Sequence, residues 1–159
     1  MPILEIAALL RNGTVEWVTR SENMFVHFFV LKSSASHNLL SNSCTTIVQA
    51  FIDRAAEFDP YLAIIVTPLY DRALQMAADN QALLDAGTDL GPLMCIPFGV
   101  KDHHQIFDDE PTTYGNIIYA NNVQKTKSVL IQHLMDYGAI PIAKTVLGTF
   151  ASGSVHGWG

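Results

Sequence analysis

The chain has 159 residues, of which 49% are hydrophobic and 15% are charged, and its formal net charge is −6. This composition supplies a packed core and excludes an intrinsically disordered protein. No long run of Lys or Arg occurs, so a nucleic-acid-binding protein is not expected. The longest apolar run near the N-terminus, "MFVHFFVL" at 24–31, is too short to span a membrane. The length suits one domain or a piece of a larger one.

The first part of the chain has an irregular pattern. In "ILEIAALLRNG" (3–13), apolar residues recur at helical spacing, and this predicts a helix that ends at the glycine. Residues 15–43 then join a β-favouring apolar run to the serine-rich loop "KSSASHNLLSNS". They continue no helical pattern on either side. We therefore interpret 15–43 as an insertion and 44–159 as the core of the domain.

Helices and short apolar strands alternate from Thr45 onward. The first helix, 45–58, carries its apolar residues on one face, with Thr45 or Thr46 as its cap and Asp59-Pro60 as its stop. Glycines end two further predicted helices, 68–87 and 128–138. Short strands are predicted at 61–67, 95–100 and 139–143. This alternation predicts an α/β fold with a largely buried sheet.

The two cysteines, Cys44 and Cys95, form no CxxC unit, and no secretory signal precedes them. Reduced thiols in an intracellular protein are the simplest interpretation, although a disulfide between the two remains open. Cys95 lies in an apolar strand, where packing is expected rather than reactivity. A cytoplasmic location follows from the reduced interpretation.

Three local patterns suggest chemistry that the surrounding sequence does not favour. "GAIPIAKT" (138–145) comes within one residue of a phosphate-binding loop, but its glycine ends a helix and leads into a strand, the reverse of the required order. His103 and His104 lack the spacing of a metal site. The third pattern, a serine near a histidine in "SGSVHGWG" (152–159), is too local for a nucleophile and its base. No metal and no cofactor are predicted.

Lys101 differs from these patterns because it ends the predicted strand of "GPLMCIPFGVKD" (91–102). In α/β proteins, functional sites gather at the carboxyl ends of strands. A partly buried ammonium is costly, so the pKa of such a lysine falls and it can act as a base. From local physics alone, a surface ion pair of Lys101 with Asp102 or Asp109 is the favoured interpretation, because most lysines are solvated.

The blocks "GPLMCIPFGVKD", "PTTYGN" and "GAIPIAKTVLGTFA" together resemble the amidase signature family, whose usual patterns are GPLxGIPxxVKD, PTTxGS and GAxxxGKTNxxEFA. The resemblance covers most of the chain from Thr45 to Ala151. It implies the N-terminal part of that family's α/β fold, with a mixed sheet core flanked by helices. Within the blocks, Cys95 and Ala143 stand where the family patterns have glycine.

The resemblance also implies a mechanism. The lysine of the VKD block, here Lys101, is the base of a Ser–cis-Ser–Lys triad that hydrolyses carboxamide bonds through an acyl-enzyme. Both serines of this triad belong to segments that would follow Gly159, so this chain carries one triad member of three. The domain at 1–159 is therefore expected to be partial and, by itself, inactive.

Two alternatives remain open at this point. The whole protein could be the A-type subunit of a glutamyl-tRNA amidotransferase, which shares these motifs and acts on aminoacyl-tRNA with partner subunits. Otherwise, the chain could be a truncated, non-catalytic interaction fragment that exposes sheet edges and core. The expected partner of the whole protein is a small amide substrate. Neither a membrane nor, outside the amidotransferase alternative, a nucleic acid is expected.

Overall fold

The computed structural model of the chain describes residues 26–27 and 43–151. Within these residues, a four-stranded sheet has the strand order β1-β3-β4-β2, with β1 at Val26–His27, β2 at Ile65–Pro68, β3 at Pro97–Lys101 and β4 at Ile140–Thr145. The central strands β3 and β4 are parallel, whereas β1 and β2 pair with them antiparallel. The sheet is therefore mixed, as predicted. The helix predicted at 3–13 lies outside the described residues.

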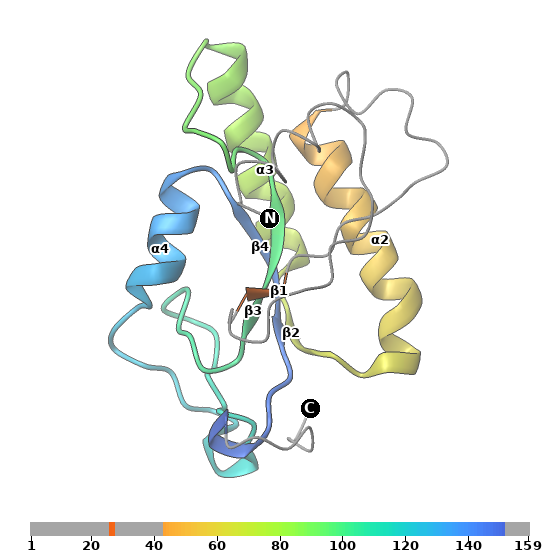
Figure 1. The fold of residues 1–159 in the computed structure, drawn as a ribbon, viewed down its shortest axis with the longest axis vertical. Helices are drawn as coiled ribbons and strands as arrows, with labels where there is room; N and C mark the ends of the chain where they lie inside the picture. The colour runs from red at the N-terminus through yellow and green to blue at the C-terminus, as the bar shows by residue number, and fades with distance from the viewer. Residues whose placement is uncertain (1–25, 28–42, 152–159) are drawn as a thin grey trace.

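Helices cover both faces of this sheet (Figure 1): α2 at Cys44–Leu62 and α3 at Tyr70–Asp85 on one face, and α4 at Val129–Asp136 on the other. One buried apolar cluster joins Val48 of α2 and Ala73 of α3 to Ile142 of β4. A second cluster joins Ile131 of α4 to Phe98 of β3. The predicted α/β fold with a helix-flanked mixed sheet is confirmed.

Helix α2 begins one residue before the predicted start. Ser43 is its N-cap, and its hydroxyl oxygen accepts the backbone N–H of Thr46 at 3.3 Å. The prediction of Thr45 or Thr46 as the cap is therefore wrong. Ser and Thr both favour the N-cap position, so residue type alone does not decide among these three positions. Burial of Cys44 and Val48, four residues apart, fixes the start because it turns this face of the helix toward the core.

The predicted stop of α2 at Asp59-Pro60 is also wrong. The helix continues through Pro60 and ends at Leu62. Its C-cap, Ala63, has a left-handed backbone (φ 48°) and donates its N–H to Asp59 O at 2.8 Å. Asp59 Oδ1 accepts the next two backbone N–H groups, each at 2.9 Å. This carboxylate therefore turns the chain, and β2 begins only at Ile65.

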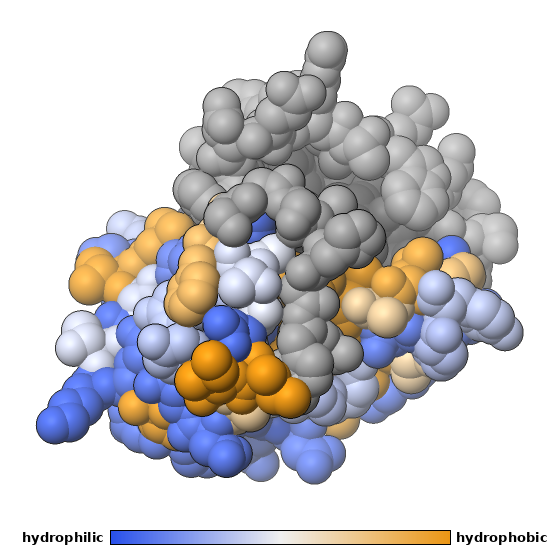
Figure 2. Space-filling view, turned by 90° about the horizontal axis from the view of Figure 1, so that it is seen from below, coloured by the Kyte–Doolittle hydropathy of each residue, from blue (hydrophilic) through white to orange (hydrophobic). Residues whose placement is uncertain are grey.

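A cluster of exposed apolar side chains lies where the loop between β3 and α4 meets the segment after β4. The rings of Tyr119 and Phe150 pack edge to face, with their centroids 5.8 Å apart. Ile117 and Ile118 are 63% and 83% exposed. Figure 2 shows apolar side chains gathered on this end of the molecule. Within the described ranges, no helix has the length and apolarity needed to cross a membrane.

Candidate functional site

Lys101 is the last residue of β3, which confirms its predicted place at a strand end. It is half-buried, and in the parallel ladder it lies opposite Thr145, the last residue of β4. Its carbonyl oxygen accepts the backbone N–H groups of His103 at 2.8 Å and His104 at 3.1 Å, so the chain turns immediately after the strand. Lys101 thus lies at the sheet edge where both parallel strands end, the usual position of a site in α/β proteins.

The fully buried lysine at this end of the sheet is Lys144, one residue beyond the strand predicted at 139–143. Lys144 belongs to β4, and its side chain has no exposed surface. Its Nζ lies 2.9 Å from Asp102 Oδ1, and it donates to Pro111 O at 2.5 Å and to Thr112 Oγ1 at 2.6 Å. These three acceptors match the three N–H groups of an ammonium. Burial lowers the pKa of Lys144, and the neighbouring Asp102 carboxylate opposes that shift.

Asp102 links three separate segments of the chain. Its backbone N–H donates to Thr145 O at 3.0 Å, and its carbonyl oxygen accepts the N–H of Tyr114 at 3.0 Å. Its Oδ2 accepts the backbone N–H of Thr113 at 3.1 Å and also the Thr113 hydroxyl. With Oδ1 against Lys144, the carboxylate is fully buried and joins the end of β3, β4 and the loop at 111–115.

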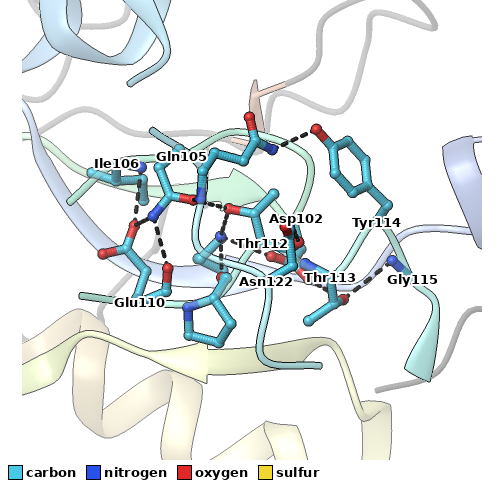
Figure 3. Close-up of polar contacts among 12 residues, drawn as sticks. Asp102, Gln105, Ile106, Glu110, Thr112, Thr113, Tyr114, Gly115 and Asn122 are labelled. Atoms are coloured by element: carbon cyan, nitrogen blue, oxygen red, sulfur yellow. Dashed lines mark hydrogen bonds and ion pairs between the residues drawn. The ribbon is translucent and has the colours of Figure 1, made fainter. Parts of the chain in front are cut away.

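The cluster around this ion pair extends into the loop that follows β3 (Figure 3). Thr112 Oγ1 donates to Gln105 Oε1 at 2.7 Å, and Gln105 Nε2 donates to the carbonyl oxygen of Glu110 at 2.7 Å. Glu110 Oε1 accepts the backbone N–H groups of Ile106 and Phe107 at 2.9 and 2.8 Å. Buried polar groups that are paired in this way hold one loop conformation.

This cluster brings together the three sequence blocks that carry the family resemblance. Asp102 comes from the VKD block, Thr112 and Thr113 come from the PTT block, and Lys144 comes from the block with KT. Sequence reasoning recognised the blocks but missed the roles of Asp102 and Lys144. The sequence signal for these roles was that Asp102 directly follows Lys101 in one block and that Lys144 lies in another block of the same resemblance.

The surface ion pair expected between Lys101 and either Asp102 or Asp109 is wrong, because both carboxylates have other partners. Asp102 pairs with buried Lys144, and Asp109 pairs with Arg72 of α3 at 2.7 Å. The Arg72 guanidinium holds the pKa of the exposed Asp109 carboxyl below its usual range. Local sequence could not predict either pair, because both partners lie more than 30 residues away.

His103 and His104 lie beside Lys101 with their rings 4.0 Å apart. The pKa of His103 is lowered to about 4, mainly by burial, and the nearby His104 and Lys101 contribute to this shift in the same direction. Burial also lowers the pKa of His104, whose Nδ1 is hydrogen-bonded to Ser128 Oγ at 2.9 Å. Within the described part of the chain, no three His, Cys, Asp or Glu side chains are grouped as a metal site would need.

Two other sequence patterns can now be placed. After α4, Gly138 has φ 85° and leads directly into β4, so the phosphate-loop order of strand, loop and helix does not occur at 138–145. The serine and histidine pattern at 152–159 lies outside the described residues.

The expectation of reduced thiols is corrected, because Cys44 and Cys95 form a disulfide with their Cα atoms 5.2 Å apart. Both residues belong to the buried cluster between α2, α3 and β4, where the start of α2 meets the turn before β3. Cys95 has φ 64°, a left-handed conformation that costs a non-glycine residue about 1–2 kcal/mol. The family's glycine at this position fits the same backbone.

Comparisons of the sequence and of the structure with known proteins point to the same family. The profile of the family described as Amidase matches residues 46–157. The chain is 37% identical over 112 residues to the A-type subunit of the glutamyl-tRNA(Gln) amidotransferase of Thermosynechococcus vestitus, and 36% identical over 121 residues to that of Heliobacterium modesticaldum. These matches cover 70% and 74% of this chain but only 23% and 25% of the relatives. The chain thus spans about a quarter of their length.

Solved structures of amidases have the same fold. The peptide amidase of Stenotrophomonas maltophilia matches with a TM-score of 0.65 and 23% identity, over 94% of this chain and 25% of that chain. A bacterial aryl acylamidase of the amidase signature family also matches with a TM-score of 0.65 and 23% identity, over 75% of this chain and 26% of that chain. At this identity, the similarity shows the fold alone.

Proposed function

We propose, because the chain belongs to the amidase family, that Lys101 is the general base of a site that hydrolyses carboxamide C–N bonds. The observation that carries the proposal is the position of Lys101 at the carboxyl ends of parallel strands β3 and β4. There it is half-buried, next to a loop held by a paired polar cluster. A fixed amine beside a reacting group is what proton transfer requires.

In the proposed mechanism, neutral Lys101 accepts a proton that passes from a nucleophilic serine through a second serine. The serine oxygen attacks the amide carbonyl, the amine leaves, and water releases the acyl group. The mechanism needs no metal and no cofactor. Neither family serine segment occurs within residues 1–159, so we propose that this chain by itself turns over no amide.

The test uses a fusion protein in which residues 1–159 replace the matching quarter of the Thermosynechococcus vestitus relative. Amide hydrolysis by this fusion protein is then measured. Lys101→Ala should lower kcat/KM on the order of 10⁴-fold, as the loss of a triad member does. The matched control is Lys125→Ala, which changes an exposed lysine in the loop between β3 and α4 and should leave the rate unchanged. Turnover that survives Lys101→Ala would contradict the proposal. So would turnover by the 159-residue chain alone.

A second candidate function is that of the A-type subunit of a glutamyl-tRNA amidotransferase. The supporting observation is that the curated relatives with this name are 36–37% identical to the chain, whereas the peptide amidase is 23% identical. Such a protein would act on aminoacyl-tRNA together with partner subunits. Formation of Gln-tRNA from Glu-tRNA and glutamine by the fusion protein and the relative's partner subunits, without hydrolysis of simple amides, would favour this function.

A non-catalytic interaction fragment is the remaining alternative, and the exposed apolar cluster at Ile117, Ile118 and Phe150 favours it. Under this alternative, the 159-residue chain should self-associate or resist purification as a monomer. A compact, protease-resistant monomer in solution would count against it.

A cytoplasmic location remains part of the proposal, and the Cys44–Cys95 disulfide opposes it, because disulfides persist mainly in oxidising compartments. Trapping the thiols in intact cells with an alkylating reagent tests this point. Two alkylated cysteines fit the cytoplasm, whereas a protected pair indicates an oxidising compartment.

A further inference from the structure

We infer that Asp102 is a positioning residue for Lys101 and acts through its buried ion pair with Lys144. The inference rests on the proposed role of Lys101. It starts from the position of Asp102, which directly follows Lys101 where β3 ends and has no exposed surface. A charged side chain is rarely buried to this extent unless it is paired, and this one is paired at both carboxylate oxygens.

The contacts of Asp102 restrain the backbone on the C-terminal side of Lys101. Its N–H extends the β3–β4 ladder to Thr145 O at 3.0 Å, and its carbonyl oxygen accepts from Tyr114 N at 3.0 Å. Its side chain reaches Lys144 Nζ on one side and Thr113 on the other. The Lys101 backbone therefore cannot rotate without breaking contacts in three segments of the chain.

Lys144, the basic partner of Asp102, cannot itself serve as the base. Its side chain has no exposed surface, and its Nζ is already surrounded by Asp102, Pro111 and Thr112. Lys101, in contrast, is half-buried at the end of the strand. The two lysines therefore have separate tasks: Lys144 fixes the Asp102 carboxylate, and Lys101 is the proposed base. Positioning of this kind matters because a displacement of about 1 Å can lower a reaction rate about 100-fold.

The test observes Lys101 directly in the 159-residue chain. Reductive ¹³C-methylation labels accessible lysines and keeps their charge, and Lys101→Arg identifies the Lys101 resonance in the NMR spectrum. In Asp102→Asn, we expect the Lys101 resonance to shift to the position of exposed Lys125, because the carboxylate that holds the end of β3 against Lys144 is lost. The matched control is Ile52→Ala, which destabilises the buried cluster at α2 but does not touch Asp102. Its Lys101 resonance should stay at the wild-type position.

A double variant separates positioning from stability. Asp102→Asn/Lys144→Met removes both charges, so it should recover stability relative to Asp102→Asn, yet its Lys101 resonance should remain shifted. If Asp102→Asn does not fold, this double variant replaces it, because it leaves no unpaired charge in the core.

Each result has a defined meaning. A Lys101 resonance at the wild-type position in Asp102→Asn would overturn the inference. So would an equal shift in Ile52→Ala, or a wild-type position in the double variant. This readout needs no turnover, so it stays separate from the test of amide hydrolysis: Lys101 can prove to be held by Asp102 and still fail as the base.

Discussion

The Cys44–Cys95 disulfide gives the sharpest prediction about stability. It links the first residue of α2 to the turn that leads into β3, and both half-cystines are almost completely buried, at 2% and 4% exposed. The perturbation is reduction of this bond in the wild-type chain. Reduction changes no other side chain, so it isolates the contribution of the covalent link.

The expected magnitude follows from the length of chain that the bond closes. The two cysteines are 51 residues apart. On the chain-entropy account, closing a loop of this length lowers the entropy of the unfolded state enough to stabilise the fold by about 4 kcal/mol at 25 °C. For a chain of this size, that loss corresponds to a fall in Tm of about 10 °C.

The assay is urea unfolding followed by circular dichroism, with and without a reductant, and with thiol titration of each sample. Oxidised protein should show no free thiol when unfolded, and reduced protein should show two. The matched control is Cys44→Ala/Cys95→Ala, whose stability should not respond to the reductant. Comparison of the double variant with reduced wild type gives the separate cost of losing the two buried side chains.

Two results would refute this reasoning. Two titratable thiols in protein purified without reductant and then unfolded would show that the bond does not form. Equal stability of the oxidised and reduced wild type, with the thiol counts confirmed, would show that the bond forms but does not constrain the unfolded chain.

Two further predictions concern pH and glycine. Because the pKa of His103 is lowered from 6.5 to about 4, the unfolded chain binds more protons between these values, so stability falls as the pH drops from about 6.5 to about 4. We expect a loss of roughly 1–2 kcal/mol, reduced by solvent screening of this partly exposed ring. His103→Gln should flatten urea-derived stability in this window, and an unchanged slope would contradict the assignment. Gly138→Ala should cost more than about 2 kcal/mol, since its φ is 85° and its Cβ would lie 2.8 Å from Met94 Cα. Gly87→Ala, with φ 81° and nothing within 4 Å, should cost only about 1 kcal/mol, and equal losses in the two variants would refute the steric argument.

Helix and strand type followed from local pattern, whereas their boundaries did not. Apolar spacing predicted α2, α3 and α4, and apolar runs predicted β3 and β4. The end of α2 was misplaced because Pro60 is tolerated in the last turn once the Asp59 carboxylate accepts the N–H groups beyond it. A carboxylate that accepts N–H groups five and six residues ahead leaves no periodic signal in the sequence.

The sequence predicted one residue of the candidate site, Lys101, but not the residues that surround it. Lys101 was predicted because it ends an apolar strand within a recognisable block of sequence, and the structure confirms that strand-end position. Lys144 was treated as part of a failed phosphate loop, and Asp102 as a surface partner for its neighbour. Their true pairing joins positions 42 residues apart, and it depends on the parallel register that places β4 beside β3.

The sequence by itself determined the family, the alternation of helices and strands, and the position of Lys101 at a strand end, because each depends on short blocks and local periodicity. Only the tertiary structure decided which lysine is buried, which carboxylate pairs with it, and that Cys44 lies against Cys95. The physical reason is that charge pairing and disulfide formation depend on distances between segments. Packing of the helices on the sheet and the register of its strands set these distances, and neither is written in the local sequence pattern.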